Sequence, residues 1–135
     1  MKRLDETRDV KPPGLRTTFR DPTFRNTLIL MSRIDVLKAQ LGGPRDGALL
    51  RYSLGAALLE DGDVSEAITQ LRKALDCDAS YSAAWKLLGR ACLQRHDTAA
   101  AADAWRQGIA AAQARGDVQA AKEMRVFLKR LPNAN

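Results

Sequence analysis

Residues 48–81, which read ALLRYSLGAALLEDGDVSEAITQLRKALDCDASY, decide the fold because the next stretch repeats their pattern. That stretch, residues 82–115, reads SAAWKLLGRACLQRHDTAAAADAWRQGIAAAQAR. The two stretches align at an offset of 34 residues. The matching positions are Leu54-Gly55 with Leu88-Gly89, Arg51 with Trp85, Leu58 with Cys92, Asp63 with Asp97, Ala67 with Ala101, Leu71 with Trp105 and Ala74 with Gly108. A fixed period of this length, with two helical segments in each unit, indicates a helical repeat protein.

Small residues recur where the two helices of a unit are expected to cross. Gly55 is expected to face Ala67 in the first unit, and Gly89 to face Ala101 in the second. Without bulky side chains between them, two helix axes can approach to about 8 Å, the lower end of the usual range. Larger apolar residues then fill the two interiors: Leu54, Leu58, Leu71 and Leu75 in the first unit, and Trp85, Leu88, Cys92 and Trp105 in the second.

Turn and capping residues divide the chain into six predicted helices. Asp63, Asp97 and Asp117 each precede an apolar stripe, and a carboxylate there accepts from a first-turn N–H, worth about 1 kcal/mol. Ser32 and Ser80 are predicted to cap two further helices. The predicted helices are Ser32–Leu41, Asp46–Glu60, 63–75, Tyr81–Gln94, 97–114 and 117–131.

With these residues the sequence resembles the tetratricopeptide repeat (TPR) family. The resemblance is strongest over 48–81, through Leu54-Gly55, Gly62-Asp63, Glu66-Ala67-Ile68 and Lys73-Ala74-Leu75. Residues 82–115 match through Trp85, Leu88-Gly89, Ala91, Ala101 and Trp105. They depart from the pattern at His96 and Gly108, and Ala79 and Gln113 stand where the family usually has proline.

The resemblance implies an all-α, TPR-type α-solenoid, similar to small stand-alone bacterial TPR proteins. Two repeats are few, because each unit buries its apolar face only against a neighbour. Flanking helices are therefore expected to act as caps, with Ala74 and Gly108 leaving room for the following helix. The expected layout is a flexible N-terminal arm (1–27) and a TPR domain (28–135), made of an N-terminal capping helix (28–44), repeat 1 (48–81), repeat 2 (82–115) and a C-terminal capping helix (116–131).

Each capping helix has one apolar stripe. In the first, the stripe is Ile34, Leu37 and Leu41. In the last, the stripe is Val118, Ala121, Met124, Phe127, Leu128 and Leu131, and the residues expected to point outward are Lys122, Glu123, Arg125, Lys129 and Arg130.

The resemblance also implies a concave groove in which an extended or helical peptide binds. By position, its lining is Leu49, Tyr52, Ser53, Ala56, Leu59, Ala83, Lys86, Leu87, Arg90 and Leu93. Lys86 and Arg90 lie one helical turn apart and can engage an acidic side chain or a C-terminal carboxylate; the alternative is a solvated basic edge. Tyr52 is the strongest candidate for a contact, the alternative being packing against Leu87 or Trp85.

The carboxylate clamp of some TPR domains is not expected here. Tyr52, Ala56 and Leu87 occupy three of the positions where that clamp uses Lys and Asn. The predicted groove is therefore apolar, with a few cations at its rim.

Other residue patterns argue against an enzyme, a cofactor or a metal site. His96 is the only histidine, and Cys77 and Cys92 lack both a catalytic base and metal-ligand spacing. Gly42-Gly43 ends a helix, so it is not placed to bind phosphate. No apolar run approaches the about 20 residues of a membrane helix, and two cysteines suit a reducing cytoplasm.

Net charge keeps a second function class open. The chain carries 22 Lys and Arg against 16 Asp and Glu, a net charge of +6. Half of this excess lies in residues 1–30, which hold seven basic and four acidic side chains. Weak polyanion or nucleic-acid binding through this arm and the basic surface is therefore the alternative to peptide binding, although basic and aromatic residues do not interleave as nucleic-acid binding favours.

Self-association is the third possibility, so a monomer or a weak homo-oligomer is expected.

Met31 has two interpretations, a core side chain or a translation start with the arm as upstream sequence.

Overall fold

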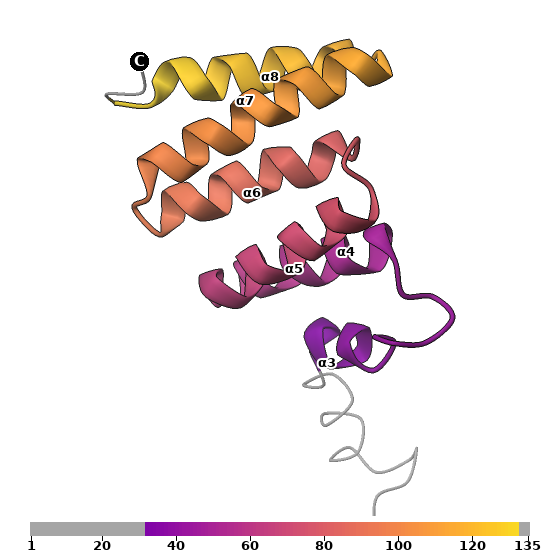
Figure 1. Ribbon diagram of the computed structural model, residues 1–135. Helices are drawn as coiled ribbons and strands as arrows, with labels where there is room; N and C mark the ends of the chain where they lie inside the picture. Colours follow the sequence, from indigo (N-terminus) through magenta and orange to yellow (C-terminus); the bar gives the residue numbers. More distant parts are fainter. Residues whose placement is uncertain (1–31, 133–135) are drawn as a thin grey trace, which may run out of the picture. The chain divides into compact units, whose positions relative to one another are not determined.

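Six α-helices make up the part of the chain that the computed structural model describes, residues 32–132 (Figure 1). They are α3 (Arg33–Lys38), α4 (Ala48–Glu60), α5 (Val64–Cys77), α6 (Ser82–Gln94), α7 (Thr98–Arg115) and α8 (Val118–Arg130). The all-α prediction is therefore confirmed. The predicted arm, Met31 and the first residues assigned to the N-terminal capping helix (28–31) lie outside the described residues.

The helices form two hairpins, α4 with α5 and α6 with α7, and these hairpins stack on each other. Helix α3 packs on α4, and α8 packs on α7, so each hairpin has a neighbour on its outer side (Figure 1). Ile34, Leu37 and Leu41 are half-buried against the common core, as their spacing predicts. One continuous core therefore runs through the described helices.

Aspartate caps begin three of these helices, as predicted. The carboxylates of Asp63, Asp97 and Asp117 accept from backbone N–H groups at 3.3, 3.1 and 3.1 Å respectively. The prediction for Ser80 is wrong, because its hydroxyl donates to the carboxylate of Asp78 at 2.7 Å and α6 begins two residues later. Asp46 likewise lies outside α4 and forms an ion pair with Arg51 at 2.8 Å.

The close approach within each hairpin differs from the predicted contact of small residue with small residue. A methyl group at Gly55 would lie 2.8 Å from the side chain of Leu71, and one at Gly89 would overlap the indole ring of Trp105. Each glycine therefore makes a hollow that a large side chain of the second helix fills. Ala67 and Ala101 are fully buried. The backbone oxygen of Ala67 does face Gly55, at 3.3 Å from such a methyl group, whereas the nearest atoms at Gly89 all belong to Trp105.

Gly108 gives room to the next helix, as predicted. A methyl group there would lie 2.5 Å from the sulfur of Met124 on α8 and 2.6 Å from Cβ of Trp85 on α6. A second contact of α8 is made by Phe127, whose ring lies 5.3 Å from that of Trp105 on α7. Trp85, expected in the core, is only half-buried.

The C-terminal helix turns slightly from its predicted orientation. Ala121, Met124 and Leu131 are buried, but Val118 is 63% exposed and Ala120 is buried in its place. The first turn of α8 is oriented by the Asp117 cap and by contacts with α6. The predicted apolar stripe is therefore wrong at its first residue, Val118.

Gly89→Ala is expected to lower the free energy of unfolding by about 1–3 kcal/mol, the usual effect of overpacking a core. Alanine favours the helix by about 1 kcal/mol, but the buried indole of Trp105 lies where the new methyl group would be. Urea titration followed by circular dichroism measures the change. Arg90→Ala, at the exposed next position of α6, is the control and should stay within about 0.5 kcal/mol; an equal loss in both variants would contradict the crowded contact.

The turn after α6 contains a strained residue. His96 has a φ of 64°, and the equivalent residue of the first hairpin is Gly62, with a φ of 90°. A side chain at positive φ crowds the following carbonyl, at a cost of about 1–2 kcal/mol that glycine avoids.

His96→Gly is therefore expected to raise the free energy of unfolding by about 0.5–1 kcal/mol, because the relief of strain exceeds the added entropy of the unfolded chain. Thermal and urea unfolding test this. His96→Ala keeps the Cβ and should bring no gain; a gain equal to that of glycine would show that the imidazole, and not the backbone, is responsible.

Candidate functional site

The candidate site lies along α4, α6 and α8. These helices contact one another in that order, α4 with α6 and α6 with α8. All ten predicted groove residues lie on α4 and α6. The third helix of this face, α8, contributes residues that were not among them.

On α4, four of the five predicted groove residues reach the surface. Leu49 is 69% exposed, and Tyr52, Ser53 and Ala56 are half-buried. Leu59 is only 8% exposed and belongs to the core, so it offers almost no contact surface. The ring of Tyr52 lies 5.1 Å from that of Tyr81, an aromatic neighbour that was not expected from the sequence.

On α6, the predicted residues divide between surface and ion pair. Ala83 and Leu87 are half-buried, while Arg90 and Leu93 are exposed. Lys86 is half-buried, and its Nζ lies 2.5 Å from a carboxylate oxygen of Glu123 on α8. Lys86 therefore already has an anionic partner, and a ligand carboxylate would have to compete with Glu123 for it.

A cleft of about 380 Å³ opens between the first turns of α6 and α8. Its lining is mostly polar and comprises Tyr81, Ser82, Ala83, Lys86, Arg115, Asp117, Gln119, Ala120 and Glu123. The buried hydroxyl of Ser82 donates to Asp117 at 2.9 Å, and Arg115 donates to the carbonyl of Ser80 at 2.9 Å. The first bond joins the start of α6 to the cap of α8, and the second joins the end of α7 to the turn before α6.

Hydrogen bonds stabilise the ionised form of two acids in this cleft. The backbone N–H of Ala120, and then the hydroxyl of Ser82, lower the pKa of Asp117 below its ordinary value of 3.8. The ammonium of Lys86, followed by the amide of Gln119, lowers the pKa of Glu123 below its ordinary value of 4.5. Both carboxylates are thus charged at neutral pH and hold α8 to α6.

These pKa directions predict that the α6–α8 contact weakens in acid. The folded state binds fewer protons than the unfolded state, so the contribution of Asp117 is present above pH 3.8 and is lost as the pH falls from there through its lowered pKa. In Asp117→Asn, which still caps a helix, the melting temperature should change less between pH 7 and about pH 3. Asp61→Asn, in the exposed turn after α4, should keep the full pH dependence of the parent; the same flattening in both would contradict the assignment.

Sequence reasoning missed the α8 side of this site. Glu123 was expected to point outward from a polar cap, whereas it is half-buried and binds Lys86. Lys86 and Glu123 are separated by little more than one repeat, so treating α8 as the first helix of a third unit would have placed them on neighbouring helices.

Within residues 32–132, no three His, Cys, Asp or Glu side chains come together as metal ligands would. Cys77 is exposed and Cys92 is buried, and burial raises the pKa of the Cys92 thiol. None of the six helices is both long and apolar enough to span a lipid bilayer.

Known proteins resemble this chain in sequence and in fold. The tetratricopeptide repeat family matches residues 35–82 and 52–117. The TPR repeat-containing protein PA0015 of Pseudomonas aeruginosa is 46% identical over 101 residues, which cover 75% of this chain and 96% of that protein.

Two solved structures share the fold. Protein BPP2914 of Bordetella parapertussis has a TM-score of 0.65 and 44% identity, over 73% of this chain and 86% of its own. MamA has a TM-score of 0.55 and 21% identity, over 67% of this chain and 61% of its own, which shows likeness of fold alone. With the family match spanning more than half of its length, this chain belongs to the tetratricopeptide repeat family.

Proposed function

We propose that the protein is a non-enzymatic interaction module that binds a peptide or protein segment along α4 and α6, up to the cleft beside α8. The observation that carries the proposal is the exposed aliphatic side chain of Leu49, with Tyr52 and Leu87 half-buried on the same two helices. Burying apolar surface of this kind drives most protein association. The family is one of protein–protein interaction modules, in agreement with this proposal.

The two ends of this surface favour different parts of a ligand. Leu49, Tyr52 and Ala56 are apolar or aromatic, whereas Lys86 and Arg90 are cationic. A segment with apolar residues over α4 and a carboxylate near α6 is therefore the best match. A ligand carboxylate would have to displace Glu123 from Lys86, so it would gain only part of the energy of that ion pair. The dissociation constant of such a peptide is therefore expected on the order of micromolar.

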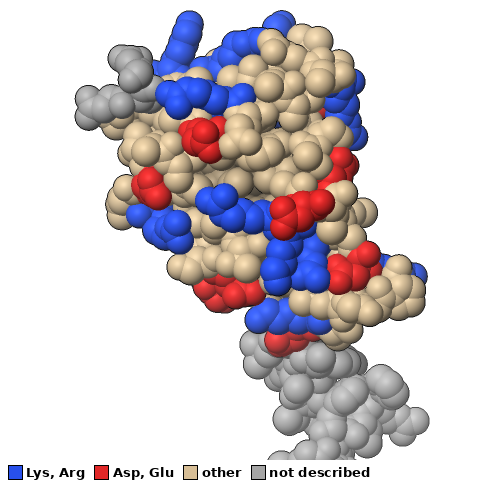
Figure 2. Space-filling model, in the orientation of Figure 1, with Lys and Arg blue, Asp and Glu red and all other residues tan. Residues whose placement is uncertain are grey.

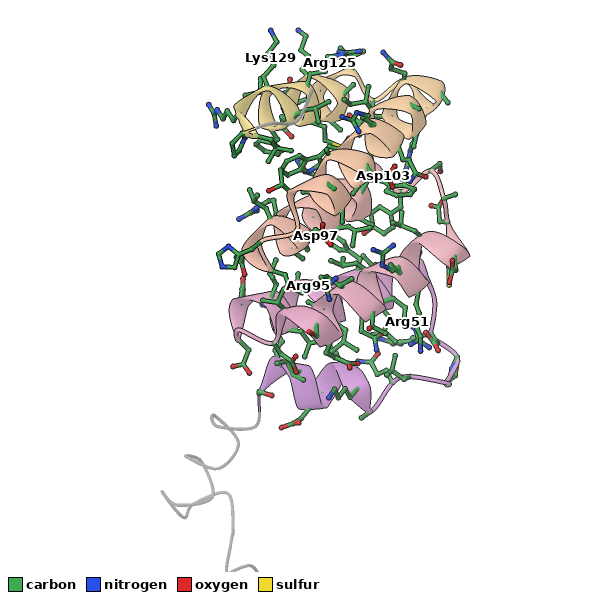
Figure 3. The ribbon with its side chains drawn as sticks, turned by 60° about the vertical axis from the view of Figure 1, so that its left-hand side comes forward. Arg51, Arg95, Asp97, Asp103, Arg125 and Lys129 are labelled. Carbon is green, nitrogen blue, oxygen red and sulfur yellow. The ribbon has the colours of Figure 1, made fainter. Side chains whose placement is uncertain are left out.

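The alternative of polyanion binding has an observation of its own. Lys122, Arg125, Lys129 and Arg130 are exposed on α8, and Figure 2 shows Lys and Arg gathered along the edge of the molecule over this helix. Arg125 and Lys129 point away from the rest of the stack in Figure 3. A polar outer face is also what a terminal helix of a solenoid needs, so this basic surface by itself favours polyanions less than the groove favours a peptide.

A reducing compartment, the cytoplasm, is the proposed location. It would keep Cys77 and Cys92 as the free thiols that the structure contains. A monomer or a weak homo-oligomer remains the proposed state.

Leu49→Glu tests the groove. Leu49 makes little contact with the core, so the fold should persist, while a carboxylate there should weaken peptide binding at least tenfold, or about 1.4 kcal/mol. Peptides selected from a displayed library on the parent protein provide the ligands, and fluorescence anisotropy measures their dissociation constants. Val118→Glu, a comparably exposed aliphatic residue on α8, is the control and should change binding less than about twofold.

Two outcomes would contradict the proposal. Selected peptides that bind Leu49→Glu as tightly as the parent would place their site elsewhere. If no peptide is selected, and labelled RNA instead binds with an affinity that falls steeply with salt, the polyanion alternative holds.

A further inference from the structure

A second cleft lies on α5, α6 and α7, away from the proposed groove on α4 and α6. It measures about 370 Å³ and is lined by Arg72, Leu75, Asp76, Trp85, Leu88, Ala100, Asp103, Ala104 and Gln107. The apolar part comes from Leu75, Trp85, Leu88 and the two alanines. The charged side chains come from α5 and α7 on either side. It is thus an indole-containing cleft with charged walls.

The first hairpin shows why this cleft is open. At the equivalent place one repeat earlier, the guanidinium of Arg51 donates to Asp46 at 2.9 and 2.8 Å and to Gln70 at 3.0 Å. Gln70 is buried and in turn donates to Glu66 at 2.9 Å. Long polar side chains therefore fill that place in the first hairpin.

In the second hairpin, each of these residues is replaced. The 34-residue offset puts Trp85 in place of Arg51, Ala104 in place of Gln70 and Ala100 in place of Glu66. Two side chains are thereby reduced to methyl groups, and the guanidinium gives way to an aromatic ring. The space that these polar side chains fill in the first hairpin is therefore open in the second.

The charges around the cleft favour a cation. Asp76 on α5 and Asp103 on α7 stand against one cation, Arg72, so the cleft carries a net negative charge. Gln107 donates to Asp103 at 2.7 Å and fixes that carboxylate on α7, where Figure 3 labels it. Within residues 32–132, Asp76 and Asp103 take part in no ion pair, so both are available to a ligand.

We propose that this cleft binds an arginine side chain of a partner polypeptide. The guanidinium would stack on the indole of Trp85 and donate to Asp76 and Asp103, while Arg72 keeps the local charge from becoming strongly negative. Arginine fits better than lysine because its planar group stacks on aromatic rings and donates to two carboxylates at once. Cation–π attraction is strongest on tryptophan among the aromatic residues. The site is separate from the groove and would add a second, charge-based contact to a partner.

NMR titration of the full chain tests this site. The probe is the peptide acetyl-Gly-Arg-Gly-amide, and the signal is the indole N–H of Trp85, which lines the cleft. A saturable shift is expected, with a dissociation constant on the order of millimolar because one side chain is bound. The matched peptide acetyl-Gly-Gln-Gly-amide, which lacks the charge, should cause no saturable shift.

A double variant, Asp76→Asn with Asp103→Asn, should weaken arginine binding at least fivefold. Both residues are exposed, so the fold should be retained, as the NMR spectrum itself will report. The control is Glu60→Gln with Asp61→Asn, which removes the same charge at the exposed end of α4. Equal weakening in both double variants, or no saturable shift with the arginine peptide, would overturn the proposal.

Discussion

The contact between Gly89 and Trp105 is the constraint on which the second half of the molecule depends. Because Gly89 has no side chain, the indole of Trp105 lies against the backbone of α6, and its N–H donates to the carbonyl of Lys86 at 3.0 Å. The same ring contacts Phe127 of α8. One side chain of α7 thus joins three consecutive helices. Lys86 then links this core to the surface, since its carbonyl binds Trp105 while its ammonium binds Glu123.

The terminal helix α8 is needed for the same reason, the close packing of one helix on the next. A hairpin of this kind leaves one apolar face open, and Gly108 lets Met124 of α8 come close enough to cover it. Ser82, Asp117 and the pair of Lys86 with Glu123 add polar contacts between α6 and α8. Helix α8 is therefore attached to both preceding helices, in the position that the first helix of a third unit would take.

Periodicity predicted the fold because every unit must solve the same packing problem. The 34-residue offset located the helices, and the Asp63, Asp97 and Asp117 caps followed from local hydrogen bonding. Contacts between units were not predictable in the same way. The Lys86–Glu123 pair, the ring contact of Tyr52 with Tyr81 and the burial of Leu59 depend on how far one hairpin rotates against the next. A rotation of a fraction of a turn also explains why Ala120 replaces Val118 in the core.

Differences between the units carry more information about function than their likenesses do. Positions conserving the period, such as Gly55 and Gly89, are needed for the helices to cross, whichever ligand the protein binds. Arg51 and Trp85 occupy equivalent positions but solve different problems: Arg51 completes a network within the chain, whereas Trp85 leaves space and two carboxylates beside it. Stacking does not require that change, because the first hairpin packs well without it. Trp85 still packs through its Cβ beside Gly108, while its half-buried ring borders the cleft, so a repeat protein can acquire a binding site at such a position without losing its fold.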